Sequence, residues 1–135
     1  MSESGNPSAG GHVLIVAAEP SMIASLRHRV ATLARASGAR DELVDDLRLV
    51  VSELATNVVQ HTDSDTIRMT FRREPTRFVL DVDDAGALTG LEHISAPGPD
   101  RLAGRGLSIV RAVMDDVEIV DDDGRRRLRC TRGIS

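Results

Sequence analysis

The chain has 135 residues, 41% of them hydrophobic, and a formal net charge of −4, a composition that fits one globular domain and does not favour binding to nucleic-acid phosphates. All 17 basic residues are arginines, which excludes sites that need a lysine, namely a P-loop, the strand lysine of eukaryotic-type kinases and a Schiff base. With two phenylalanines, no tyrosine or tryptophan and one cysteine, the chain also lacks base-stacking platforms and an internal disulfide.

The apolar runs are short, and none approaches the roughly 18 residues of a membrane span. Residues 13–18 are too few for the core of a signal peptide and have no basic leader before them. We therefore expect a cytoplasmic protein without membrane contact. Residues 1–11 are mainly Ser, Gly, Asn and Pro, which predicts a disordered tail ahead of a single domain at residues 12–135.

A strand and two helices are predicted first. Residues 12–18 form the strand. Apolar residues at helical spacing then predict a helix with Ser21 as its N-cap, ended by Gly38. A second, longer helix is predicted with Asp41 as its cap, and its apolar stripe reaches about His61.

The second half of the chain is predicted to be mostly strands. Alternation of apolar and polar residues indicates them, and Gly or Pro marks the turns between them. The elements expected, in order, are strands around residues 67–71 and 78–83 joined by a turn at 74–76, a long loop at 85–103, a helix at 106–114, and strands at 117–120 and 126–131 around a turn at 121–124.

Glu53 and Asn57 lie four residues apart on the second predicted helix and therefore share one face. Gln60 and His61 fall in the same quadrant, away from the apolar stripe. Asparagine is a poor residue for the middle of a helix, so its position needs a reason, and its amide oxygen is a suitable ligand for Mg²⁺. The Glu53 carboxylate can orient or deprotonate a nucleophile. The alternatives are a solvated polar face and, for His61, a capping or packed side chain.

Asp84 follows a predicted strand and shares the parity of its apolar residues, whereas Asp81 and Asp83 are expected to face outward. A carboxylate on the core side needs a hydrogen-bond donor, which the exocyclic amine of adenine can supply. Gly86 would let a flat base approach the backbone. The alternative is that Asp84 caps its own turn.

Gly104, Arg105 and Gly106 stand at the predicted start of the third helix, with Leu107 next. Backbone amides at a helix N-terminus bind phosphate, and glycine permits close approach. Arg105, or Arg101 before it, can add positive charge in place of the missing lysine. A pair of glycines is a weak signal by itself.

In this order the three motifs, at residues 53–61, 84–86 and 104–107, resemble the N, G1 and G2 boxes of the GHKL (Bergerat-fold) ATPases. The resemblance implies an α/β fold, more closely an α+β two-layer sandwich, with a mixed, mostly antiparallel sheet and helices on one face. It also implies Mg-ATP between the sheet and the helices, under a mobile lid at residues 87–103.

The resemblance assigns a role to each matching residue. Asn57 would hold Mg²⁺, Glu53 would act as general base and Asp84 would read adenine. The other residues that would bind the nucleotide are Gly86, Gly104, Arg105, Gly106 and Leu107. Leu88 departs from the family, because it stands where the G1 box has its usual second glycine.

The compact strand-helix-helix start followed by Glu-Leu-x-Thr-Asn-x-x-x-His most resembles the RsbW/SpoIIAB-like branch. That branch consists of anti-sigma factors that are also serine/threonine kinases. The resemblance implies a homodimer that sequesters a sigma factor and phosphorylates an anti-anti-sigma antagonist on Ser or Thr, without direct nucleic-acid contact. The alternatives are a nucleotide-gated sequestering regulator with little or no transfer, a kinase of this branch outside sigma-factor control, and an α/β domain with no nucleotide.

One basic cluster near the C-terminus is not part of these motifs. It consists of Arg125, Arg126, Arg127, Arg129 and Arg132. Two interpretations are open: a surface for an acidic partner, or a solvated edge strand on which arginines prevent strand addition.

Overall fold

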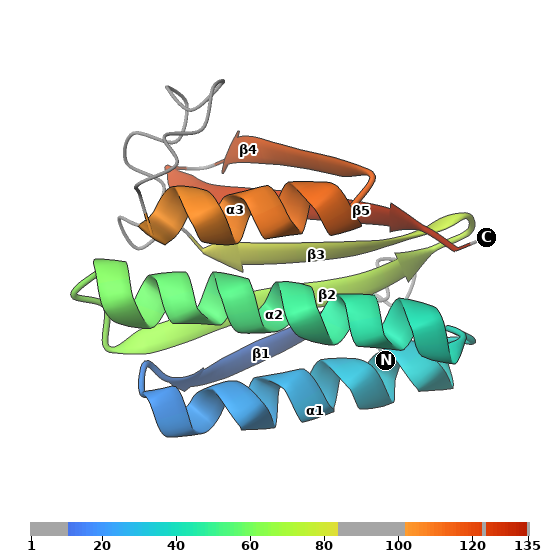
Figure 1. Cartoon of the computed structure of the whole chain (residues 1–135), viewed down its shortest axis with the longest axis horizontal. Helices are drawn as coiled ribbons and strands as arrows, with labels where there is room; N and C mark the ends of the chain where they lie inside the picture. Colours follow the sequence, from blue (N-terminus) through green and yellow to red (C-terminus); the bar gives the residue numbers. More distant parts are fainter. Residues whose placement is uncertain (1–10, 84–101, 123, 135) are drawn as a thin grey trace.

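The computed structural model describes residues 11–83, 102–122 and 124–134, with the side chains of residues 102–106 and 122 left out (Figure 1). The elements follow the chain in the order β1 (His12–Ala17), α1 (Pro20–Ala36), α2 (Asp41–His61), β2 (Thr66–Glu74), β3 (Arg77–Asp83), α3 (Leu102–Val113), β4 (Asp116–Asp122) and β5 (Arg125–Gly133). The predicted tail, apart from Gly11, and the predicted lid, apart from residues 102 and 103, lie outside the described residues.

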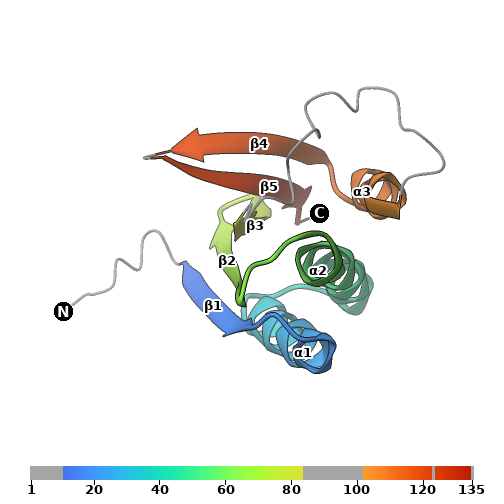
Figure 2. The ribbon, with the colours of Figure 1, turned by 90° about the vertical axis from the view of Figure 1, so that its left-hand side faces the viewer.

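The strands form one sheet in the order β1-β2-β3-β5-β4, and each of its four neighbouring pairs is antiparallel. The three helices lie together on one face of this sheet (Figure 2). The predicted α+β two-layer architecture is confirmed. The edges of the sheet are β1 and β4, so the prediction that the arginine-rich segment is an edge strand is wrong: β5 lies between β3 and β4.

The hydrophobic core fills the space between the sheet and the helices. The predicted stripe of α2 is buried along its whole length, from Leu43 to Val58. It faces the alternate residues of the central strands, where the rings of Phe71 and Phe78 stack with centroids 5.5 Å apart. The core residues of β2 and β3 are Ile67, Met69, Phe71, Phe78, Leu80 and Val82.

The helix starts differ from the predicted ones. The N-cap of α1 is Glu19, with Pro20 at the first helical position, and the N-cap of α2 is Arg40; neither cap makes a side-chain hydrogen bond. At the start of α1, Pro20 has no N–H that would need a partner. At the start of α2, the helix dipole favours the negative charge of Asp41 in the first turn. Both helices are therefore stable at their N-termini without the predicted caps. α1 ends as predicted, with Gly38 at φ 96°.

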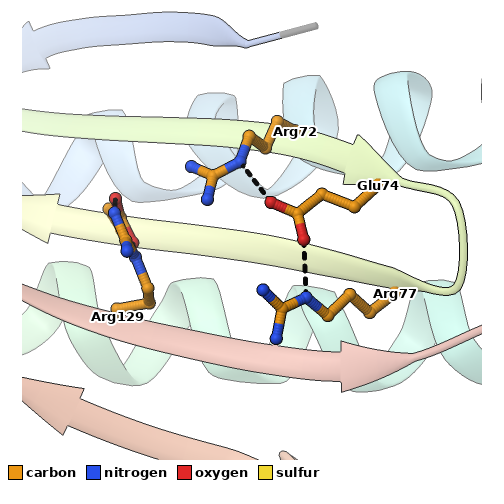
Figure 3. A network of polar contacts seen from close by, with 5 residues as sticks. Arg72, Glu74, Arg77 and Arg129 are labelled. Carbon is orange, nitrogen blue, oxygen red and sulfur yellow. Dashed lines mark hydrogen bonds and ion pairs between the residues drawn. The ribbon is translucent and has the colours of Figure 1, made fainter. Parts of the chain in front are cut away.

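Among the described residues, no helix lies on the other face of the sheet, which carries paired charges. Asp81 lies on this face as predicted, but it is buried rather than exposed, because Arg129 of β5 donates hydrogen bonds from Nε and Nη2 to its two oxygens at 2.9 and 3.0 Å. Glu74 accepts from Arg72 and Arg77 at 2.9 and 2.6 Å (Figure 3). Arginine stems and paired carboxylates therefore close this face.

In the described ranges, no helix combines the length and the apolarity that crossing a membrane requires.

Candidate functional site

The C-terminal half of α2 carries Glu53 and Asn57 on one face, as the helical spacing predicts. Both side chains are half-buried, at the margin of a core that Leu54 and Val58 enter fully. Within the described residues, neither Glu53 nor Asn57 makes a side-chain hydrogen bond or ion pair. A carboxylate and an amide held in this way are available to a ligand.

Three segments that are distant in sequence meet at the same end of the molecule. The C-terminal half of α2, the end of β3 and the start of α3 all lie at the left of Figure 1. α2 and α3 pack side by side, with Val110 of α3 fully buried. The fold therefore brings the predicted N box and G2 box to one end of the helical layer.

The start of α3 lies four residues earlier than predicted, at Leu102 rather than residue 106. Gly104, Arg105 and Gly106 are therefore in the first turns of the helix and not in front of it. The first four N–H groups of a helix have no partner within the helix, and the dipole makes this end attractive to anions. A helix of 12 residues that starts beside the C-terminal half of α2 is suited to hold a phosphate there.

Asp84, Gly86, Leu88 and Arg101 lie outside the described residues. β3, the strand that leads to Asp84, ends at Asp83. The adenine-reading role of Asp84 therefore stays a prediction.

Leu107 is 6% exposed and belongs to the hydrophobic core. Any contact that it makes with a nucleotide would be apolar. Its assignment to the nucleotide site also stays a prediction.

The contacts at the end of α2 bear on whether His61 is a packed or a capping side chain. Its side chain is exposed, so it is not a packed core histidine. The hydroxyl of Thr62 donates to the carbonyl of Val58 at 2.7 Å and so takes the capping position. Gln60 is exposed as well.

One bridge that the sequence did not reveal joins α2, α3 and β5 at the end of the helical layer away from the candidate site. Arg132 of β5 donates from Nη1 to Asp46 of α2 at 2.5 Å and to the carbonyl of Val113, the last residue of α3, at 3.0 Å. The bridge therefore links α2 and α3 through β5, in addition to the direct packing of the two helices. The partners are 86 and 19 residues apart in sequence, so no local pattern could have indicated it.

The single cysteine takes no part in the chemistry of this end. Cys130 is fully buried in β5, and burial raises the pKa of its thiol to about 12, with Asp81 and Asp116 adding to the effect. A thiol with so high a pKa is a neutral core residue at physiological pH. Among the described residues there is also no group of three or more His, Cys, Asp or Glu that could hold a metal ion.

Comparison with known proteins identifies the fold. Residues 16–132 match the family described as the histidine kinase-like ATPase domain. The chain belongs to this family. The match includes both motif-bearing helices, and it confirms the resemblance to the GHKL ATPases. ATP is the ligand that an ATPase domain implies.

Curated proteins similar to this chain include several named serine-protein kinase RsbW. Those of Bacillus cereus (strain AH187) and Bacillus anthracis (strain CDC 684 / NRRL 3495) are each 27% identical to the chain over 122 residues, which cover 81% of this chain and 76% of the relative. The protein of Bacillus thuringiensis (strain Al Hakam) is 26% identical over the same coverage. The chain is thus similar to the RsbW-like branch predicted from its motifs.

Proposed function

We propose that this chain is an ATP-binding anti-sigma factor that sequesters a sigma factor and phosphorylates an anti-anti-sigma antagonist on Ser or Thr. The observation that carries the proposal is the meeting of Glu53 and Asn57 on α2 with the N-terminus of α3 at one end of an ATPase-family fold. The relatives named serine-protein kinase support the reaction class.

The residues at this end suit Mg-ATP in their chemistry. The amide oxygen of Asn57 is a hard ligand without a partner among the described residues, and Mg²⁺ commonly takes only one or two protein oxygens beside nucleotide phosphates. The N-terminal amides of α3, with the arginine at residue 105, suit the phosphates in a chain that has no lysine. When bound, Mg-ATP supplies the phosphoryl group to be transferred.

In this proposal Glu53 acts as the general base. Its carboxylate would accept the proton of the attacking serine or threonine hydroxyl of the antagonist. Asn57, one helical turn further on, would hold the metal on the same side, and the α3 amides would keep the phosphates in place. Asp84 would select adenine, with Gly86, Gly104 and Gly106 permitting close approach of the nucleotide.

The partners in the proposal are a sigma factor and its antagonist, bound by a homodimer of this chain in the cytoplasm. The name serine-protein kinase, which the relatives carry, supports phosphoryl transfer to serine and says nothing about the partners. Light scattering of the purified chain tests the dimer, and a monomer at tens of micromolar protein would contradict it.

The kinase role is tested by Glu53→Gln, with Asp45→Asn as a matched control, since Asp45 is an exposed acid in the first half of the same helix. The assay uses ATP labelled at the γ-phosphate and the protein that co-purifies with the tagged chain, and ATP affinity is measured separately. We expect Glu53→Gln to keep ATP affinity and to lower transfer by about a hundredfold or more, because only the proton acceptor is lost. The control should match the native chain.

Each other outcome has its own meaning. Equal transfer by the native chain and Glu53→Gln would remove Glu53 from the catalytic role. ATP binding by the native chain without transfer would favour the alternative, a nucleotide-gated sequestering regulator. Absence of ATP binding would overturn the proposal.

A further inference from the structure

Two neighbouring arginines at the start of β5 lie on opposite faces of the sheet. Arg125 is on the face where no described helix lies, and its Nη2 donates to both oxygens of Asp83 at 2.9 Å. Side chains alternate along a strand, so Arg126 is on the helix-covered face, as are Leu128 and Cys130, which are buried in the core. Arg126 is thus turned toward the space between the sheet and the helices.

The pairing of the strands places Arg126 at the end of the sheet that belongs to the candidate site. The register of β3 and β5 pairs Asp83, the last residue of β3, with Arg127. Arg126 precedes Arg127 on an antiparallel strand, so it lies one residue further toward the end at which β3 stops. The C-terminal half of α2 and the start of α3 lie at this same end, at the left of Figure 1. Arg126 is therefore a residue of the sheet beside the candidate site.

A charged side chain is exceptional at this position. At this end of the three central strands, the nearest other described residues that face the helices are Ile67 of β2, Val82 of β3 and Leu128 of β5, all of them buried and apolar. Arg126 is half-buried, and its Nε atom is buried. A guanidinium has five N–H donors in a planar fork, which is enough to bond to a ligand as well as to the chain. A nucleotide with an acceptor at this position would use these donors.

The other parts of the proposed nucleotide site leave the base for Arg126. The phosphates are assigned to the first turn of α3 and Mg²⁺ to Asn57 of α2, both in the helical layer. Asp84, which is predicted to accept from the exocyclic amine of adenine, follows Asp83 in the chain, and Asp83 pairs with the neighbour of Arg126. In adenine an accepting ring nitrogen lies on each side of that amine, N1 on one edge and N7 on the other. A donor on the neighbouring strand is therefore suited to one of these nitrogens.

We propose that Arg126 is a specificity-determining residue of the nucleotide site, whose guanidinium donates a hydrogen bond to N1 or N7 of adenine. This contact rests on the proposed function, because it needs ATP, and it adds a residue of β5 to the site. Phosphate is the other part of a nucleotide that a guanidinium binds well, and the experiment below distinguishes the base from the phosphates.

The test compares ATP with analogues that each lack one of the two acceptors. Calorimetry measures the binding of ATP, 7-deaza-ATP and 1-deaza-ATP, each with Mg²⁺, to the full native chain and to Arg126→Met. We expect Arg126→Met to bind ATP about tenfold more weakly, because a hydrogen bond from a charged donor is lost. The native chain should lose about the same factor with the analogue that lacks the accepting nitrogen. Arg126→Met should bind that analogue as tightly as it binds ATP, since the contact is already absent.

Two further variants separate the contact from effects on folding. Arg125→Met removes an exposed arginine from the other face of the same strand, and it should bind all three nucleotides as the native chain does. Arg126→Gln has a shorter, uncharged side chain and takes the place of Arg126→Met if that variant does not fold. Circular dichroism confirms that each variant is folded.

Three results would overturn the assignment of Arg126 to the base. They are native affinity for ATP in Arg126→Met, native-chain affinities that do not differ among the three nucleotides, and a loss in Arg126→Met that is equal for all three. The last result would assign Arg126 to the phosphates instead. Absence of ATP binding by the native chain is a different outcome, because it would overturn the proposed function itself and the contact with it.

Discussion

At the scale of single residues, Asp81 is the carboxylate most completely removed from water among the described residues, at 2% exposed. Its charge is compensated by the two hydrogen bonds from Arg129, which also raise the pKa of that guanidinium. A buried charge is tolerated only when it is paired. The stability of the central strands thus depends on one side chain of β5.

We predict that Arg129→Ala lowers the free energy of unfolding by about 3 kcal/mol, because it leaves Asp81 buried and unpaired. Urea denaturation followed by circular dichroism measures this. The double variant Asp81→Leu/Arg129→Met replaces the pair by apolar groups and should recover most of the loss. If the double variant were as unstable as Arg129→Ala, packing rather than the uncompensated charge would be the cause.

Glu74 makes the free energy of unfolding depend on pH in the acid range. Its hydrogen bonds from Arg77, then from Arg72, hold the pKa of this carboxyl below its ordinary 4.5 (Figure 3). A carboxyl with a lowered folded-state pKa contributes stability above its ordinary pKa and loses that contribution as the pH falls through the folded value. We predict that Glu74→Gln is less stable than the native chain at pH 7, by less than about 1 kcal/mol, and that the gap closes below pH 4.5.

Denaturant unfolding of both proteins at several pH values measures this gap. Asp63→Asn, at an exposed acid after α2, is the control and should show a smaller pH dependence. A gap that stays constant with pH would show that Glu74 acts through packing alone.

At the scale of elements, the bridge from Arg132 holds α2, α3 and β5 together. We predict that Arg132→Met lowers the free energy of unfolding by about 1–3 kcal/mol, since Asp46 loses its partner and the Val113 carbonyl loses a donor. Hydrogen exchange should show reduced protection in α3. Arg73→Met, at an exposed arginine of β2, should change stability by less than about 0.5 kcal/mol. Unchanged protection of α3 in Arg132→Met would remove the bridge as its anchor.

The elements themselves could be predicted well because their signals are local. Alternation located β2 and β3, and helical spacing located α2 with Glu53 and Asn57 on one face. The helix caps were mispredicted, because backbone conformation and Pro20 started the helices without capping side chains.

Long-range pairing could not be predicted from local patterns. Nothing within β5 indicates that it lies between β3 and β4, and Asp81 is buried by an arginine 48 residues away. The meeting of α2 with α3 follows from the same tertiary packing. Asp84 stays a prediction from resemblance.

At the scale of the whole molecule, ligand binding should raise the free energy of unfolding. We predict that Mg-ATP at a hundredfold excess over its dissociation constant stabilises the folded chain by about 2.7 kcal/mol. Thermal unfolding with and without Mg-ATP measures this. The shift should be lost in Asp84→Asn and kept in Asp45→Asn. No shift in the native chain at millimolar ATP would count against nucleotide binding altogether.

The acidic β4 edge has a consequence for behaviour at high concentration. A molecule that accepts strands at both sides can become a link in an open-ended fibre, because each added copy offers a fresh acceptor. In this chain β4 carries Asp116, Glu118 and Asp121, so two copies repel each other when they approach through their β4 edges. The acidic β4 edge therefore disfavours fibres that would grow by the pairing of like edges.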